Sequence, residues 1–166
     1  MTALGSILAG ARILAADVQA VAPLAIIKGA DQSVTSSVAM QNDDALLVNV
    51  EANASYLLLC YLDYEGGTRG ASDLKWQWAV PSGASLRYQR LCVDPSSNPQ
   101  FTTMSTATVG TAGSNGAGVL QGVTMNGTLT TSATPGTLQL QWAQNTSSAT
   151  ATIVHAQSSL ALWRIS

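Results

Sequence analysis

The stretch from Gly136 to Ile165 constrains the fold most, because it reads as consecutive β-strands. Leu138, Leu140 and Trp142 alternate with polar side chains, which is the period-two pattern of a strand with one buried face. The polar run 145–148 interrupts this pattern, and a β-branched alternation follows over 150–154. We expect these two strands to return on each other as an antiparallel hairpin. A third short strand is expected over 160–165.

Similar short alternating runs, separated by turn-forming residues, fill the chain after residue 24. Their spacing is close to the 8 to 12 residues typical of sandwiches and barrels. The sequence therefore predicts an all-β fold, an antiparallel two-sheet sandwich of the jelly-roll type, with about eight strands. Besides the three strands near the end, the main runs are 45–50, 55–64, 73–80, 86–93 and 119–131.

The run 55–64 differs from the others because both of its alternating faces are largely apolar. A strand of this kind is typical of a central position covered on both sides. One face carries Tyr56, Leu58, Cys60 and Leu62, and the other carries Leu57, Leu59, Tyr61 and Asp63.

The segment from Thr2 to Pro23 is the only region with helical composition, and Pro23 would end such a helix. We therefore divide the chain into an N-terminal arm or helix, residues 1–30, and a β-sandwich domain, residues 31–166. The arm either packs on its own domain or anchors the chain through a neighbouring subunit. The residues of its candidate anchoring face are Leu4, Ile7, Leu8, Ile13, Leu14 and Val18.

Two targeting interpretations of the same segment are not favoured. It has no basic region ahead of its apolar residues, and Arg12 and Asp17 interrupt them, so we do not expect a secretory signal peptide. No stretch reaches about 18 uninterrupted apolar residues, so no membrane insertion is expected.

Charge is scarce in this chain. Only 10% of the residues are charged, and 7 Lys and Arg face 9 Asp and Glu, which gives a formal net charge of -2. The basic surface of a nucleic-acid-binding protein is therefore not expected. A weakly charged surface is typical of a protein covered by other subunits, although a weakly charged monomer is the alternative.

No group of residues predicts catalysis, a metal site or a cofactor. The single histidine, His155, lies in an expected strand, and neither Ser158 nor Ser159 has the glycine pattern of a nucleophile elbow. One His with Cys60 and Cys92 matches no zinc spacing, and both thiols are expected to be buried and free. The carboxylates cluster at turns, where they cap backbone amides. We predict a protein that is not an enzyme, with a glycosidase carboxylate pair left open because their separation is not readable from sequence.

A carbohydrate-binding β-sandwich module is the alternative function. Such a module would stack a sugar ring on exposed aromatic side chains, for which the candidates are Trp76, Trp78 and Tyr88. The other interpretation of these three residues is a buried aromatic core.

Several segments resemble small structural proteins of tailed bacteriophages, especially actinobacterial phages, that are described as minor tail or decoration proteins. The segments that carry the resemblance are 9–17, 27–37, 42–44, 52–56, 73–75, 80–84 and 140–147. The closing strands also look like those of trimeric jelly rolls of the tumour-necrosis-factor and complement globular-head type.

The resemblance implies a non-enzymatic virion protein, assembled in the host cytoplasm, that forms a homotrimer and contacts capsid or tail proteins. It would attach through its N-terminal arm and present its loops outward, with a host cell-surface glycan as a further expected partner. It supplies no catalytic residues and no cofactor. It leaves open whether the position is on the head or on the tail.

Overall fold

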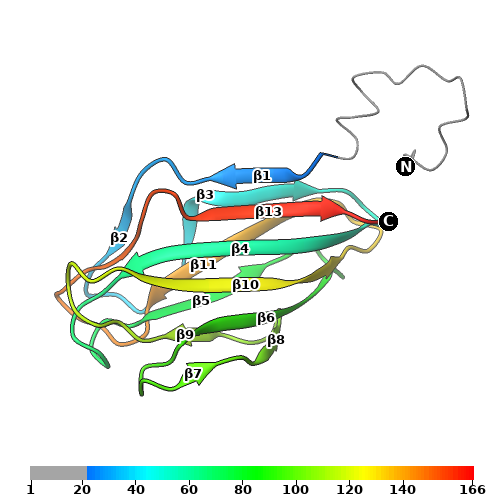
Figure 1. The fold of residues 1–166 in the computed structure, drawn as a ribbon. Coiled ribbons are helices and arrows are strands. Elements are labelled where there is room, and N and C mark those ends of the chain that lie inside the picture. The colour runs from blue at the N-terminus through cyan, green and yellow to red at the C-terminus, as the bar shows by residue number, and fades with distance from the viewer. Residues whose placement is uncertain (1–21) are drawn as a thin grey trace, which may run out of the picture.

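A computed structural model describes residues 22–166 of the chain, and these residues form two stacked antiparallel β-sheets without a helix (Figure 1). This confirms the predicted all-β sandwich. Within the described range no helix is long and apolar enough to cross a membrane. The candidate anchoring residues Leu4, Ile7, Leu8, Ile13, Leu14 and Val18 lie outside the described residues.

The larger sheet, called sheet A here, has the first and last described strands side by side. Its path runs in the order β1 (Leu24–Ile27), β13 (Ser159–Arg164), β4 (Ser55–Glu65), β10 (Gln121–Thr130), β6 (Ser85–Val93) and β7 (Pro99–Gln100). Three short strands pair beside this path, namely β2 (Gln32–Val34), β12 (Thr152–Val154) and β8 (Thr103–Ser105).

The smaller sheet, called sheet B here, lies against the larger one. Its order is β3 (Gln41–Val50), β11 (Gly136–Gln144), β5 (Leu74–Ala79) and β9 (Gly110–Ala112). Apart from β6 with β7 and β8, the strands that neighbour each other come from distant parts of the sequence, and the chain crosses repeatedly from one sheet to the other. This interleaving of two sheets is the arrangement of a jelly roll.

The closing stretch of the chain is not a hairpin, and this corrects the sequence prediction. The alternation of β11 is as predicted, because Leu138, Leu140 and Trp142 are buried. However, β11 pairs with β3 and β5 in sheet B, whereas β12 pairs with β2 and β4 in sheet A. Residues 145–151 therefore cross between the sheets.

The core between the sheets is formed by the inward-facing residues of both, with aromatic rings at its centre. Trp76 and Trp142 are cross-strand partners on β5 and β11, and both are fully buried. Gly110 on β9 lies against the indole of Trp76, and a Cβ at this position would collide with the ring. The two cysteines, Cys60 and Cys92, are buried and free as predicted, and burial raises the pKa of both thiols.

The strand 55–64 is central as predicted, but only one of its faces is covered by the described residues. Tyr56, Leu58, Cys60, Leu62 and Tyr64 are buried against sheet B. The opposite face of β4, which points away from sheet B, is half exposed.

Candidate functional site

The outer face of sheet A carries an exposed apolar surface, and we call it the sheet A face. Register places three rows of side chains across β1, β13, β4, β10 and β6. Side chains of alternate residues share one side of a sheet, so each row belongs to the same face. The first row holds Ile27, Ser159, Tyr61, Thr124 and Leu91; the second Ala25, Ala161, Leu59, Asn126 and Gln89; the third Trp163, Leu57, Thr128 and Arg87.

Most apolar members of these rows lie on β1, β13 and β4, and Leu91 lies on β6. Leu57, Leu59 and Tyr61 are 47%, 45% and 42% exposed, and they follow one another along β4. Ile27 is 71% exposed and Trp163 is 38% exposed, on the strands to one side. Arg87 is the only charged side chain in the three rows.

The middle row has short side chains on β1 and β13, because Ala25 and Ala161 are both small. They lie between the larger side chains of the first and third rows. The face is therefore apolar at its centre and bordered by amides, hydroxyls and one guanidinium on β10 and β6. An apolar centre with a polar rim is the usual composition of a protein interface.

A shallow hollow of about 450 Å³ lies between the edge strands β1 and β3. It is lined by Pro23, Leu24, Ala25, Ile26, Leu47, Val48 and Asn49. None of these side chains is ionisable, so the hollow offers no side-chain acid or base.

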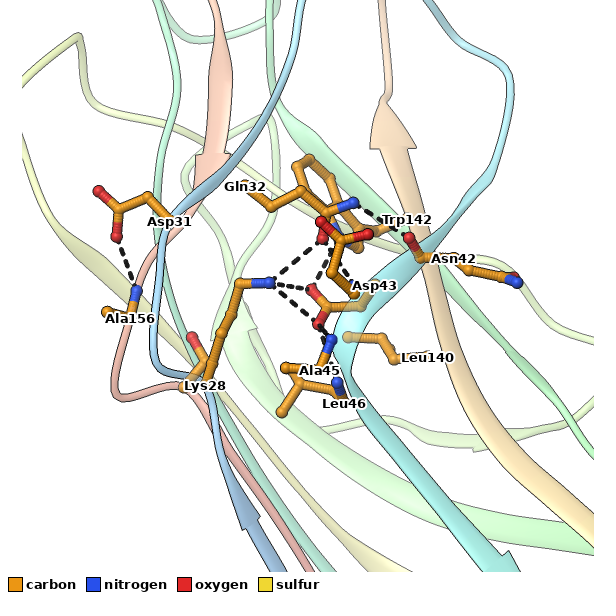
Figure 2. Close-up of polar contacts among 12 residues, drawn as sticks. Lys28, Asp31, Gln32, Asn42, Asp43, Ala45, Leu46, Leu140, Trp142 and Ala156 are labelled. Carbon is orange, nitrogen blue, oxygen red and sulfur yellow. Dashed lines mark hydrogen bonds and ion pairs between the residues drawn. The ribbon is translucent and has the colours of Figure 1, made fainter.

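A buried ion pair connects the same two edges from the inside (Figure 2). Lys28, directly after β1, places its Nζ 3.1 Å from both carboxylate oxygens of Asp43, on β3. Both side chains are almost completely buried. Asp43 also accepts hydrogen bonds from the backbone amides of Ala45 and Leu46 and from Nε1 of Trp142.

Every polar atom of this pair has a protein partner. The Oε1 of Gln32 accepts from Lys28 Nζ at 3.2 Å and from the Asp44 amide at 2.9 Å. The Asp43 carboxylate thus accepts hydrogen bonds from two backbone amides, an indole and the Lys28 ammonium group. The arrangement stabilises both charges and leaves no free group for proton transfer.

His155 lies between two carboxylates, those of Asp31 and Glu65. Its Nδ1 is 3.2 Å from Oδ2 of Asp31, and its Nε2 is 3.8 Å from Oε2 of Glu65. Asp31 accepts from the Ala156 amide, and Glu65 accepts from the Gly118 amide. The Ala156 amide first, and then the His155 side chain, lower the pKa of Asp31. The group joins three loops, and neither Ser158 nor Ser159 takes part in an interaction with His155 like that of a triad: Ser158 Oγ bonds the backbone of Asp63.

Two other carboxylates also organise loops. Buried Asp73 accepts from the amides of Gly70 and Ser114. Asp94 accepts from the amides of Ser96 and Asn98, and the Asn98 amide contributes most to lowering the pKa of Asp94. These contacts confirm the expectation that turn carboxylates cap backbone amides. Within residues 22–166 no group of three or more His, Cys, Asp or Glu side chains is placed to hold a metal ion.

The three aromatic residues predicted as sugar-stacking candidates are all in the core. Trp76 is fully buried, and Trp78 and Tyr88 are almost so. Trp76 Nε1 donates to Tyr88 Oη at 3.2 Å, and burial raises the pKa of Tyr88 to about 12. These three aromatic side chains point into the core between the two sheets, and they alternate along their strands with Lys75, Gln77 and Gln89. They therefore cannot form an exposed platform.

Sequence reasoning missed the sheet A face as a site, although it had noticed its central strand. The two apolar faces of 55–64 were the available signal. The apolar residues Ile27 and Trp163 join Leu57 and Tyr61 only through strand pairing, which the sequence does not show.

The chain has no match among protein families. No family model and no curated protein matches it. Among solved structures, it is similar to infectious bursal disease virus, Gt strain, at 13% identity over 86% of this chain and 41% of that chain, with a TM-score of 0.20. It is also similar to the VP2 subviral particle of infectious bursal disease virus, at 13% identity over 87% and 41% of the two chains, with a TM-score of 0.23.

These structural neighbours are virus-particle proteins, and this chain spans about two fifths of their length. Their TM-scores are far below 0.5, so the likeness carries no argument about function.

Proposed function

We propose that this chain is a non-enzymatic structural module of a tailed-phage virion, assembled as a homotrimer and displayed on the particle as a capsid decoration or minor tail protein. One observation carries the proposal: a β-sandwich with few charges exposes a continuous apolar surface on the outer face of its larger sheet. Surfaces of this kind mark protein–protein contact sites. The sequence resemblance to phage structural proteins supplies the virion setting.

The polar groups of the described residues support an interaction role rather than catalysis. Lys28 and Asp43 neutralise each other in the core. The His155 group and the turn carboxylates bind loop backbone. The hydrogen bonds that these side chains make hold the sandwich and its loops in shape, whereas the buried Nε2 of His155 has no hydrogen-bond partner.

In this proposal the parts of the chain divide the work. The sandwich is the body displayed on the particle, where it stabilises the shell or contacts the host. Residues 1–22 attach it to capsid or tail proteins. The loops at the ends of the sandwich face outward.

The test measures the solution mass of the full chain by light scattering, together with co-sedimentation with purified virion heads and tails. A mass of three chains and binding to one particle part is expected, and the part that binds assigns the position. A variant that lacks residues 2–22 is expected to keep its β-sheet circular dichroism and to lose co-sedimentation. A monomer that binds neither heads nor tails would overturn the proposal.

The same preparation tests the carbohydrate-binding alternative. Quenching of tryptophan fluorescence by a cell-surface polysaccharide, with no particle binding, would favour that alternative. Because Trp76 and Trp78 are buried, the exposed Trp163 would then have to report the contact.

A further inference from the structure

We propose that the sheet A face is the surface on which a second copy of this chain packs. This inference rests on the proposed function, because it names the contact by which the homo-oligomer forms. The occupant is argued from the size of the face, its composition and its position in the fold.

The size of the face suits a subunit contact. The strands β1, β13, β4, β10 and β6 have 4, 6, 11, 10 and 9 residues, a mean of 8, which at about 3.3 Å per residue is a mean length of about 26 Å. The five strands are about 4.8 Å apart, so the face is about 20 Å wide. Its footprint is on the order of 500 Å², or about 1,000 Å² for the two partners together, which reaches the lower bound of a specific interface.

The N-terminal segment is the competing occupant, and the width of the face argues against it. Ile27 and Leu91 are the two ends of one row, four strand spacings apart. This is about 19 Å, whereas a helix with its side chains is about 10–12 Å across. Both ends are well exposed, at 71% and 48%. A single helix lying along the strands would cover only one of them, while a second sandwich covers both.

The composition of the face suits a contact between identical chains. Its centre has no charge to desolvate: Arg87, the charged side chain of the three rows, lies at the border, and Asp63 lies beyond Tyr61 on the same side of β4. Tyr61 and Trp163 supply large aromatic surfaces, which are enriched at the energetic centres of interfaces. In a ring of three copies this face contacts a different patch on the next copy, as cyclic symmetry requires.

The first test substitutes Leu59, at the centre of the face, in the full chain. The Leu59→Asp variant is expected to scatter light as a single chain at concentrations where the unmodified chain has the mass of three. The matched control is Leu47→Asp, because Leu47 is 38% exposed on the outer face of sheet B. This control is expected to keep the mass of the unmodified chain. Circular dichroism and urea unfolding check that both variants are folded.

A second variant covers the case in which the aspartate prevents folding. The Leu57→Gln/Leu59→Gln variant adds no charge and gives β4 the outer-face composition that sheet B already tolerates. It is expected to raise the dissociation constant of the oligomer at least tenfold. An unchanged mass and dissociation constant in these folded variants would overturn the inference.

Deletion of residues 2–21 separates the two occupants. If a second copy covers the face, the truncated chain keeps its oligomeric mass; if it becomes a monomer, the N-terminal segment is the occupant and the inference is wrong. Failure of the proposed function looks different. In that case Leu59→Asp still dissociates the oligomer, but the unmodified chain binds neither heads nor tails.

Discussion

The outer faces of the two sheets differ in a way that separates assembly from folding. The outer face of sheet B is polar: Gln77 donates to Gln141 at 2.7 Å, and Gln141 donates to Asn42 at 2.8 Å. The outer face of sheet A places leucines, an isoleucine and aromatic rings at equivalent positions. Both sheets bury their inner faces in the core. The difference therefore concerns what each sheet meets outside the domain.

A row of hydrogen-bonded side-chain amides on the outer face of sheet B gives this difference its physical basis. Its side chains bond to one another and to the backbone, as Gln139 does with the carbonyls of Asp43 and Leu140. The polar groups of such a face have hydrogen-bond partners when the face is exposed to water. The leucine side chains on the outer face of sheet A make no hydrogen bonds with water. Burying them removes apolar surface from water, which is favourable by about 25 cal/mol per Å².

The largest expected effect is on the free energy of unfolding, and it concerns Asp43, the carboxylate that β3 of sheet B places in the core. Asp43→Asn leaves Lys28 buried without its counter-charge, so unfolding in urea is expected to lose about 3–5 kcal/mol. The double variant Lys28→Met/Asp43→Asn is the control, and it is expected to recover part of this loss because it also removes the stranded ammonium. A single-variant loss below about 1 kcal/mol would show that the pair does not hold β1 to β3.

The next effect compares the two sides of β4. Leu58 points into the core and is 3% exposed, so Leu58→Ala is expected to cost about 2–5 kcal/mol of unfolding free energy. Leu59→Ala, one residue further along, is expected to cost less than about 0.5 kcal/mol at concentrations where the chain is a monomer. Urea unfolding of both variants measures the difference. Equal losses would mean that the sheet A face is covered within the single chain.

A smaller effect is expected on the outer face of sheet B. Gln141→Ala removes the amide contacts to Gln77 and Asn42, and it is expected to cost about 1 kcal/mol. The mass of the oligomer is expected to stay unchanged, because this face carries no subunit contact in our proposal. A change in mass by light scattering would place the contact on sheet B instead.

The smallest effect concerns a loop outside both faces. The pKa of Asp31 is lowered, mainly by the Ala156 amide. A carboxyl with a lowered folded-state pKa stabilises the fold above its ordinary value of 3.8, and this contribution is lost as the pH falls through the lowered pKa. Asp31→Asn is therefore expected to reduce the slope of stability against pH below about pH 4. An unchanged slope would contradict this role, and Asp44→Asn serves as the comparison.

Much of the fold was predictable because alternation is a local property. The buried faces of β11, β5 and β6 follow directly from Leu138, Trp76 and Tyr88 and their polar neighbours. The free and buried state of Cys60 also followed, because this residue lies inside a strand. The turn roles of Asp43 and Asp73 were recognisable because Asp caps backbone amides two or three residues away.

Which strands pair with each other was harder to predict from the sequence. The polar run 145–148 looks like a hairpin turn, yet it carries the chain from sheet B to sheet A. Sequence alternation says which side of a strand is buried, but both pairings satisfy the same alternation. The sheet A face depends on this information, because Ile27 and Tyr61 are distant in sequence and meet across Ser159.

The sequence by itself determined the all-β class, the inward residues of the main strands and the absence of a basic field, since these depend only on local pattern and composition. Only the tertiary structure decided which strands share a sheet, that Lys28 and Asp43 meet in the core, and that one outer face is apolar. The physical reason is that partner choice between strands is set by packing of the whole core and by closure of long connections. A surface made from five strands exists only after those choices are made.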